Sequence, residues 1–338
     1  MTEPAALRYP MTPDDVRSLV RACLPREGDS GRKAPHGPAV LAIGAFDGVH
    51  LGHRQLISAS VEDARARNAT SVVVTFDPDP SELFLGEAAQ PRLLSISDRV
   101  AFCSSLGVDE VMVVPFTQDF AALDPDSFAS FLDERLHGVR SVHVGSNFRF
   151  GAGGVGDVEA LARLGSERGF DVTAHPLLSA LGEPVSSTRI RSLLLEGDVA
   201  DARRLLGRCH YVRGSVAHGR GEGTSFGFPT ANVCCDGRTC MPREGVYACI
   251  VTDGTTAWPS AANVGAPPTF SSHRDAFLEA NLIGFEGDLY GSELLVIFVE
   301  WLRASRPFSS LDELERVVLG NIDWVRHNVG DQGVEVWA

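Results

Sequence analysis

The sequence predicts two domains of different fold class, an α/β domain followed by an all-β domain. In the first half, short apolar runs rich in β-branched residues alternate with helix-like stretches, a pattern typical of parallel β-α-β units. After about residue 209, short strand-like runs follow one another between Gly, Pro and Asp turns, which is typical of an antiparallel barrel. A chain of 338 residues is long enough for about two such domains.

This division gives three segments. Residues 1–37 form an N-terminal extension, residues 38–208 a doubly wound parallel-sheet domain, and residues 209–338 an antiparallel β-barrel with a closing helix. In the extension, Thr12 and Pro13 begin a short predicted helix that runs through Leu24. A polar linker rich in Gly and Pro follows it.

The α/β segment contains five predicted strands and the helices between them. The strands are expected at residues 40–43, 71–76, 110–116, 139–144 and 171–177. The helices are expected at residues 54–68, 95–106, 126–136 and 157–168, with two shorter ones at 192–195 and 199–206. Because ligands of such sheets bind at the carboxyl ends of the strands, the loops after the first, second and fourth strands are candidate site loops.

The barrel segment consists of short apolar runs between turn residues. Its strands are expected at residues 211–217, 246–251, 260–264, 277–285 and 294–302. An amphipathic helix from Leu311 to about His327 is expected to cover one end of the barrel. Asp312 and Glu313 lie in its first turn, where acidic side chains interact favourably with the helix dipole.

Composition and charge exclude several classes of protein. No apolar run approaches the ~20 residues of a membrane span, and the N-terminus lacks the apolar core of a secretory signal. The net charge of −14 is opposite in sign to that of most nucleic-acid-binding surfaces. Seven cysteines without a C-x-x-C pair predict reduced thiols. We therefore expect a cytoplasmic protein without membrane or nucleic-acid partners, and no pattern indicates an oligomeric state.

The loop after the first predicted strand carries the most informative motif. Residues 44–53 place His50 and His53 three positions apart around Gly52, at a turn from strand to helix. Backbone N–H groups and the helix dipole favour phosphate at such a turn, and glycine lets phosphates approach the backbone. Two imidazoles there can stabilise charge on the α-phosphate of a nucleoside triphosphate. The motif indicates a nucleotidyltransferase, with incidental turn histidines as the alternative.

We take His50 and His53 as candidate catalytic residues of this loop. The candidate nucleotide-binding residues beside them are Gly44, Phe46, Asp47 and Gly52. A second phosphate-binding group is expected at a helix start, where Ser187, Thr188 and Arg191 combine hydroxyls with a guanidinium. An ordinary helix cap with solvated arginines is the alternative there.

Two further loops of the α/β segment hold candidate ligand groups. Asn147 follows the fourth predicted strand and can bond a base or sugar, while Phe148 or Phe150 can stack on a ring. A core aromatic pair is the alternative. Asp77 and Asp79 follow the second strand, where they can approach a magnesium–nucleotide or cap a turn. The pattern leaves both possibilities open.

The stretch from residue 219 to 232 is the informative part of the barrel segment. Its glycines form a loop whose backbone can wrap phosphates, although the Gly-Lys-Ser/Thr of a Walker A loop is missing. Thr230 and Asn232 face the same side of an extended segment and can bind a magnesium ion that bridges ATP phosphates. A flexible loop before a strand is the alternative. The nucleotide-binding residues predicted here are Gly219, Gly223, Gly227, Pro229, Thr230 and Asn232, and the last two are also the predicted metal ligands.

Glu279 is an unexpected carboxylate in an otherwise apolar strand. If its side chain points into a pocket, it can take a proton from an attacking hydroxyl. If it faces solvent, it reflects the ordinary alternation of a half-buried strand. The pattern alone does not decide between the two.

In combination, these motifs resemble the prokaryotic bifunctional riboflavin kinase/FMN adenylyltransferases, also called FAD synthetases. The resemblance runs from about residue 38 to about residue 324, with the motifs in the family's order: residues 44–53, 75–78, 107–109, 147–151, 186–191, 227–232, 245–247, 263–270 and 288–291. It implies that the barrel converts riboflavin and ATP to FMN and ADP. The α/β domain then converts FMN and a second ATP to FAD and pyrophosphate. Mg²⁺ accompanies ATP, and FMN and FAD are substrate and product rather than prosthetic groups.

The resemblance also implies roles for single residues. His50 and His53 match residues that bind and stabilise the ATP phosphates, and Ser187, Thr188 and Arg191 match residues that complete that site. Glu279 matches the proposed base for the ribityl 5′-hydroxyl. The matches expected at the flavin are Asn147, Arg149 and Arg303.

A few positions depart from the family's pattern. Asp79 replaces a histidine, and residues 152–154 replace a stretch where a basic residue often stands. In the barrel, Asn281 and Gly284 replace histidine and aspartate, and Ser305 replaces a glutamate. The phosphate-handling residues are intact, so both activities are expected. The alternatives are a monofunctional kinase for riboflavin or a modified flavin, with a degenerate first domain, and a flavin-binding regulator without turnover.

Overall fold

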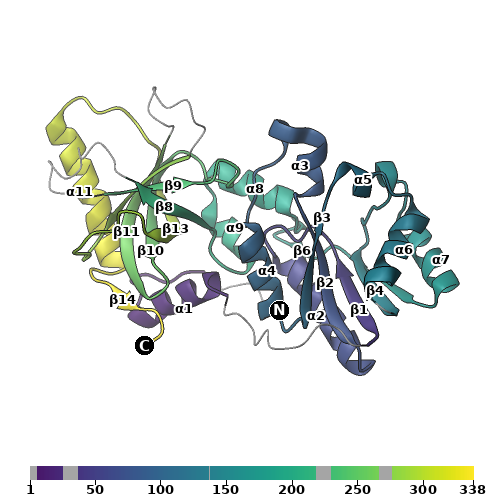
Figure 1. Cartoon of the computed structure of the whole chain (residues 1–338). Coiled ribbons are helices and arrows are strands. Elements are labelled where there is room, and N and C mark those ends of the chain that lie inside the picture. The colour runs from purple at the N-terminus through teal and green to yellow at the C-terminus, as the bar shows by residue number, and fades with distance from the viewer. Residues whose placement is uncertain (1–5, 26–36, 137, 218–229, 266–275) are drawn as a thin grey trace. The chain divides into compact units, whose positions relative to one another are not determined.

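The computed structural model describes residues 6–25, 37–136, 138–217, 230–265 and 276–338 (Figure 1). Its contacts divide the chain into two compact units. The first unit comprises residues 25–186. The second comprises residues 2–24 together with residues 187–338. In the described part of the chain, no helix is both long and apolar enough to cross a membrane.

The first unit contains a five-stranded parallel sheet in the order β3-β2-β1-β4-β5. The strands are β1 (Ala39–Ile43), β2 (Thr70–Asp77), β3 (Glu110–Pro115), β4 (Val139–Gly145) and β5 (Asp171–His175). The helices are α2 (Leu51–Ala66), α3 (Pro80–Leu85), α4 (Ile96–Ser105), α5 (Gln118–Ala121), α6 (Pro125–Leu136) and α7 (Val158–Arg168). Two 3₁₀ turns, η1 (Gly86–Ala88) and η2 (Ala152–Gly154), and a hairpin of β6 (Ser179–Ala180) and β7 (Glu183–Pro184) complete it.

Helices cover both faces of this sheet. Leu41 and Ile43 of β1 belong to a core cluster that includes Leu132 of α6 and Leu161 of α7. The alternate residues of β1 point to the opposite face, which contacts α2. The predicted doubly wound sheet is therefore confirmed.

The strand order determines where a ligand can bind. The chain passes from β1 to β2 on one side and later returns to β4 on the other side of β1. In open α/β sheets, the carboxyl ends of strands at such a reversal border the ligand crevice. The loops that follow β1 and β4 are those that carry the predicted motifs around His50 and Asn147.

The second unit contains a closed antiparallel barrel, as predicted, with six strands where five were expected. Its strands follow the order β10-β13-β8-β9-β12-β11, and pairing of β10 with β11 closes the ring. They are β8 (Tyr211–Ala217), β9 (Ala231–Cys235), β10 (Gly245–Thr252), β11 (Thr256–Gly265), β12 (Ala276–Leu282) and β13 (Glu293–Arg303), with β14 (Val334–Glu335) beside β11. Among the described residues of this unit, the helices are α1 (Pro13–Cys23), α8 (Ser187–Glu196), α9 (Val199–Leu206) and the closing helix α11 (Leu311–Asn328).

Several elements differ from the sequence prediction. The strand β9 was not among the predicted strands, although residues 230–232 were expected to be extended, and β11 begins four residues before the predicted strand. The difference at β11 arises because Pro259 occupies the strand interior, opposite Ile250, where proline normally argues against a strand. The helix α8 begins at Ser187 rather than at residue 192.

The N-terminal extension contributes to the second unit. Thr12 caps α1 in a reciprocal capping box with Asp15, and the Met11 N–H donates to the Asn328 carbonyl at 2.7 Å. Arg21 Nε donates to the Val336 carbonyl at 2.7 Å. The division by contacts assigns α1, α8 and α9 to the unit that contains the barrel. The domain limits predicted at residues 37 and 208 stay a prediction.

The C-terminal segment also explains one of the unusual residues. Gly284 has φ +75°, and a Cβ at this position would lie 2.9 Å from the Asp331 carbonyl oxygen. The backbone after α11 thus occupies the space that a side chain at position 284 would need.

Candidate active sites

The loop from β1 to α2 places two imidazoles at a helix N-terminus. His50 is the N-cap residue of α2, and its Nδ1 accepts a hydrogen bond from the His53 N–H at 3.3 Å. The two rings stack with centroids 3.5 Å apart and planes 19° apart. The structure therefore brings both candidate catalytic histidines together, at the end of the helix where anions are favoured.

Glycines and one aromatic ring shape this loop. A Cβ at Gly52 would lie 3.2 Å from the His50 ring, and a Cβ at Gly44 would lie 3.1 Å from the Phe46 ring. Phe46 packs edge-on against His53, with centroids 5.2 Å apart. These three predicted residues thus set the shape around the imidazoles.

His53 has an unusual electrostatic environment. Burial, the neighbouring His50 and the cation of Arg99 together hold the pKa of His53 well below its usual value. The ring is therefore neutral near pH 7, and its Nδ1 is a buried atom without a hydrogen-bond partner in the described structure. A buried polar atom of this kind calls for an explanation, and a bound ligand is one.

Asp47 and Arg99 lie behind the loop. Asp47 accepts hydrogen bonds from the Leu93 and Leu94 N–H groups, each at 3.0 Å. Arg99 was not among the predicted site residues, although its guanidinium reaches the Ala45 carbonyl at 2.8 Å. The available signal was an arginine on the buried face of a predicted helix, where a charge is uncommon unless it has a partner.

The loop after β4 borders an aromatic cavity of about 180 Å³. Phe148 lines this cavity and is half-buried, whereas Phe150 is buried against Phe128, with ring centroids 5.2 Å apart. The two rings also stack on each other, with centroids 5.7 Å apart, so the structure shows the core aromatic pair, and stacking of Phe148 on a ligand stays a prediction. Arg149 lines the same cavity, and the other aromatic rings around it are Phe76, Phe84, Phe116 and Phe120.

Asn147 lies in the loop two residues after the end of β4, and it is exposed. Its Oδ1 would lie 3.0 Å from a Cβ at Gly145, so the glycine leaves room for the amide. Asn147 and Arg149 thus lie in one loop, of which Arg149 lines the aromatic cavity.

The two carboxylates after β2 have partners within the first unit. Asp79 caps α3 by accepting hydrogen bonds from the Ser81 N–H and hydroxyl. Asp77 forms an ion pair with Arg92 at 3.1 Å, and Arg92 also pairs with Glu82. Of the two alternatives for Asp79, the structure shows the cap.

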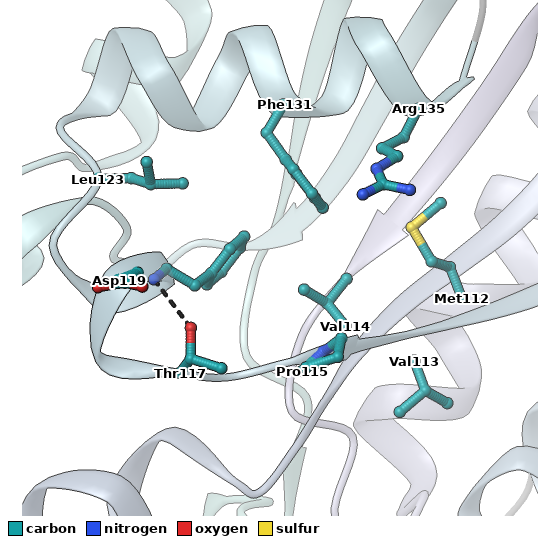
Figure 2. A pocket seen from close by; sticks show the side chains of 10 residues that line it. Met112, Val113, Val114, Pro115, Thr117, Asp119, Leu123, Phe131 and Arg135 are labelled. Atoms are coloured by element: carbon teal, nitrogen blue, oxygen red, sulfur yellow. Dashed lines mark hydrogen bonds between the residues drawn. The ribbon is translucent and has the colours of Figure 1, made fainter.

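A larger cavity, of about 720 Å³, lies beside the edge strand β3 (Figure 2). Its walls include Met112 of β3, Phe131 and Arg135 of α6, and the turn in which the Phe120 N–H donates to Thr117 Oγ1. None of the predicted site residues lines it. Size alone therefore does not mark the site in this unit.

Ser187, Thr188 and Arg191 lie in the first turns of α8, within the second unit. Ser187 and Arg191 are half-buried and Thr188 is exposed. The predicted association of these residues with His50 and His53 joins residues of two units and stays a prediction.

The barrel places polar residues from three adjacent strands in one row. Glu279 of β12 pairs directly with Asn232 of β9 on one side and with Asn263 of β11 on the other. Directly opposed residues of antiparallel strands have Cβ atoms about 4.5–5.5 Å apart. Ser305 extends the row, because its hydroxyl donates to Asn263 Oδ1 at 3.1 Å.

This row lies on the outer, half-buried face of the barrel wall. Leu278 and Ala280, the neighbours of Glu279, are fully buried, whereas Glu279 and Asn232 are half-buried. Glu279 therefore lies outside the apolar interior without being fully exposed. Asn263 belongs to the family motif at residues 263–270 but was not among the predicted site residues. Its position beside Glu279 follows only from the strand register.

Two further predicted site residues of the second unit, Thr230 and Arg303, lie next to or at the ends of barrel strands. Thr230 is half-buried and directly precedes β9, whereas Gly219, Gly223, Gly227 and Pro229 lie outside the described residues. Arg303 ends β13 with its guanidinium 5.6 Å from the Phe308 ring. Burial, and then the charge of Arg306, lower the pKa of Arg303.

Two family models and several known proteins match this chain. The FAD synthetase model matches residues 32–189, and the riboflavin kinase model matches residues 206–328. A bifunctional riboflavin kinase/FMN adenylyltransferase of Escherichia coli K12 is 40% identical over 284 residues, 84% of this chain and 90% of that protein. The protein with the same description from Pseudomonas fluorescens is 38% identical over 85% of this chain and 92% of its own length.

A solved structure has a similar fold. It comes from Streptococcus pneumoniae, is described as a macrolide-efflux protein, and is 28% identical with a TM-score of 0.79, over 88% of this chain and 96% of that one. Both family models lie in the order found here, and the identity to the curated relatives extends over most of the chain. The chain therefore belongs to the family of bifunctional riboflavin kinase/FMN adenylyltransferases.

Proposed function

We propose that this chain makes FAD from riboflavin in two ATP-dependent steps. The barrel unit transfers the γ-phosphoryl group of ATP to riboflavin, which gives FMN and ADP. The α/β unit transfers the adenylyl group of a second ATP to FMN, which gives FAD and pyrophosphate. The observation that carries this proposal is the presence of two separate polar centres, the stacked pair His50 and His53 and the row around Glu279, each in the matching family domain.

In the adenylyl-transfer step, a phosphate oxygen of FMN attacks the α-phosphorus of ATP, and pyrophosphate leaves. Negative charge builds on the phosphoryl oxygens, so donors fixed near the α-phosphate accelerate the reaction. His50, His53 and the N-terminal N–H groups of α2 supply such donors. The neutral state of His53 leaves one ring N–H for this purpose. Ser187, Thr188 and Arg191 are proposed to hold the remaining phosphates.

The aromatic cavity is the proposed site for the flavin ring of FMN. Phe76, Phe116 and Phe148 lie at or just after the ends of β2, β3 and β4, where ligands of such sheets bind. Stacking on an aromatic side chain such as Phe148 suits a flat heterocycle. Asn147 and Arg149, in the same loop, are proposed to contact the polar parts of FMN.

In the kinase step, the ribityl 5′-hydroxyl attacks the γ-phosphorus of ATP, and ADP leaves. Glu279 is proposed to accept the proton of that hydroxyl, because it stands in a polar row beside an apolar barrel wall. Asn232, directly opposite, is proposed to hold the phosphates together with Thr230. Arg303 is proposed to contact the flavin.

Magnesium is the proposed metal of the kinase step. Thr230 and Asn232 offer oxygen ligands beside the Glu279 carboxylate, a donor set that Mg²⁺ prefers. When bound with ATP, the ion neutralises phosphate charge. Since all seven cysteines are free thiols, we also propose that the enzyme acts in the cytoplasm.

One chromatographic experiment tests the two-step proposal. The purified protein is incubated with riboflavin, ATP and MgCl₂, and the flavins are separated over time. FMN that appears first and is then replaced by FAD supports the proposal. FMN without FAD, even from added FMN, would instead favour a monofunctional kinase, and the absence of any product would leave a binding role.

A further inference from the structure

The loop between β1 and α2 holds backbone conformations that most residues avoid. Phe46 and Val49 have φ angles of +51° and +38°, and Val49 is β-branched, for which a positive φ is an outlier. Such conformations cost about 1–3 kcal/mol each and persist only where the surrounding structure holds them. Because this loop ends at His50, the groups that hold it also set the position of the imidazoles.

Arg99 connects this loop to the end of β2. Its Nη1 donates to the carbonyl oxygens of Ala45, at 2.8 Å, and of Phe76, at 3.2 Å. Thr75 supports the same point, because its hydroxyl donates to the Ala45 oxygen at 2.9 Å. The Arg99 side chain is 2% exposed, so both carbonyl contacts form in a dry environment.

Asp47 holds the loop from the other direction. Its two oxygens accept the N–H groups of Leu93 and Leu94, in the segment that leads into α4. Its Oδ1 lies 3.8 Å from Arg99 Nη2, and its side chain is 5% exposed. The loop is thus held twice by a buried pair of opposite charges: Arg99 joins it to α4, and Asp47 joins it to the segment just before α4.

We propose that Arg99 and Asp47 are positioning residues for adenylyl transfer, which hold the strained loop so that His50 and His53 face the α-phosphate of ATP. Asp47 then acts from behind the loop and not as a ligand of the nucleotide. This inference rests on the proposed role of the two histidines. It also requires that Arg99 and Asp47 affect kcat/KM for ATP.

The substitution Arg99→Lys tests the inference with little risk of unfolding. Lysine keeps a buried cation, but its single ammonium nitrogen cannot take the place of Nη1, which bonds the Ala45 and Phe76 carbonyls, and of Nη2, which faces Asp47, at the same time. We expect kcat/KM for ATP in FAD formation from FMN to fall at least tenfold, with a rise in KM. A role in stability alone would reduce the amount of folded enzyme and leave KM unchanged. Asp47→Asn, which disturbs the two N–H contacts, is expected to act in the same direction.

Arg67→Lys provides the matched control. Arg67 follows α2 at its opposite end, where it pairs with Asp63 and Asp171, so its replacement should leave KM for ATP unchanged. FMN formation by the same samples reports the intact second unit. Wild-type kcat and KM in both Arg99→Lys and Asp47→Asn would overturn the inference.

A third variant separates this inference from the proposed function. If His50→Ala abolishes FAD formation while Arg99→Lys and Asp47→Asn behave as wild type, only the positioning role is wrong. If His50→Ala itself retains FAD formation, the proposed adenylyl-transfer site is wrong.

Discussion

Glu279 and Asn232 are directly paired residues of neighbouring antiparallel strands, and both lie outside the apolar interior of the barrel. A carboxylate and an amide in this relationship can serve one substrate from two strands. The pairing of β12 with β9 fixes the separation of the two side chains, so the strands do not have to move to bring them together. If the proposed kinase site is right, we expect FMN formation to be sensitive to small changes at either position.

Glu279→Gln should reduce FMN formation from riboflavin by about 10²–10⁴-fold, the usual contribution of a general base. Glutamine keeps the shape of the side chain but cannot accept the proton. FAD formation from supplied FMN should remain at the wild-type rate, as measured by chromatography of the flavins. A parallel loss of both activities would contradict the assignment of two separate centres.

His50→Ala should have the opposite selectivity. It removes one ring of the stacked pair and the cap of α2, and the loss of one such donor typically costs about 10²–10³-fold in rate. FAD formation from FMN should therefore fall, while FMN formation from riboflavin should not change. Retained FAD formation would argue against the proposed role of this loop.

Acid should destabilise the second unit through His210. Burial is the main reason that the pKa of His210 falls from 6.5 to about 4, and its Nε2 lies 2.8 Å from the Cys240 carbonyl oxygen. The pKa of His210 is lower in the folded state than in the unfolded state, so the buried neutral ring contributes its full stability above pH 6.5. That contribution is lost as the pH falls toward 4. The loss amounts to about 3 kcal/mol, from about 1.4 kcal/mol per unit.

Urea unfolding at pH 7 and pH 4.5 measures this effect. All four tryptophans belong to the second unit, so their fluorescence follows its unfolding: Trp258, Trp301, Trp324 and Trp337. His210→Gln does not titrate, so it should lose less stability between the two pH values than the wild type. An equal loss in both proteins would show that other groups cause the acid sensitivity.

Val20→Ala should destabilise the second unit even though Val20 lies far from the barrel in the sequence. Val20 is completely buried in α1, and removal of buried methyl groups costs about 1–3 kcal/mol with the cavity left behind. Tryptophan fluorescence in urea is again the measurement. Leu311→Ala is a suitable control, because Leu311 is 63% exposed and its truncation should change stability little.

Gly284→Ala should be more destabilising than Gly291→Ala. Both glycines have φ +75°, so the two substitutions share the cost of a left-handed backbone, about 1 kcal/mol. A Cβ at Gly284 would also meet the Asp331 carbonyl oxygen at 2.9 Å, whereas a Cβ at Gly291 would meet no atom within 4 Å. The difference between the two variants in urea unfolding isolates the collision, and equal effects would contradict it.

The sequence was sufficient for features that depend on local patterns. The alternation of strands and helices and the switch to short strands after residue 209 correspond to the observed sheet and barrel. The turn that carries His50 and His53 was predictable because the strand, the glycines and the helix that shape it are contiguous.

Features that depend on distant residues were not predictable. Arg99 reaches Ala45 across 54 positions, and Asn263 joins Glu279 only through the strand register. Neither relationship leaves a periodic pattern in the sequence. Pro259 lies inside β11, opposite Ile250, a position that the local rule against proline in strands does not predict.

The position of α1 has a consequence for how the chain folds during synthesis. Arg21 contacts Val336, 315 positions later, so a contiguous α/β unit is inserted between the two parts of the other unit. The inserted unit can fold while the ribosome is still translating the barrel, but α1 must wait for its partners. We therefore expect the α/β unit to become protease-resistant first on the nascent chain. A barrel fragment that starts at residue 187 would lack a helix of its own core.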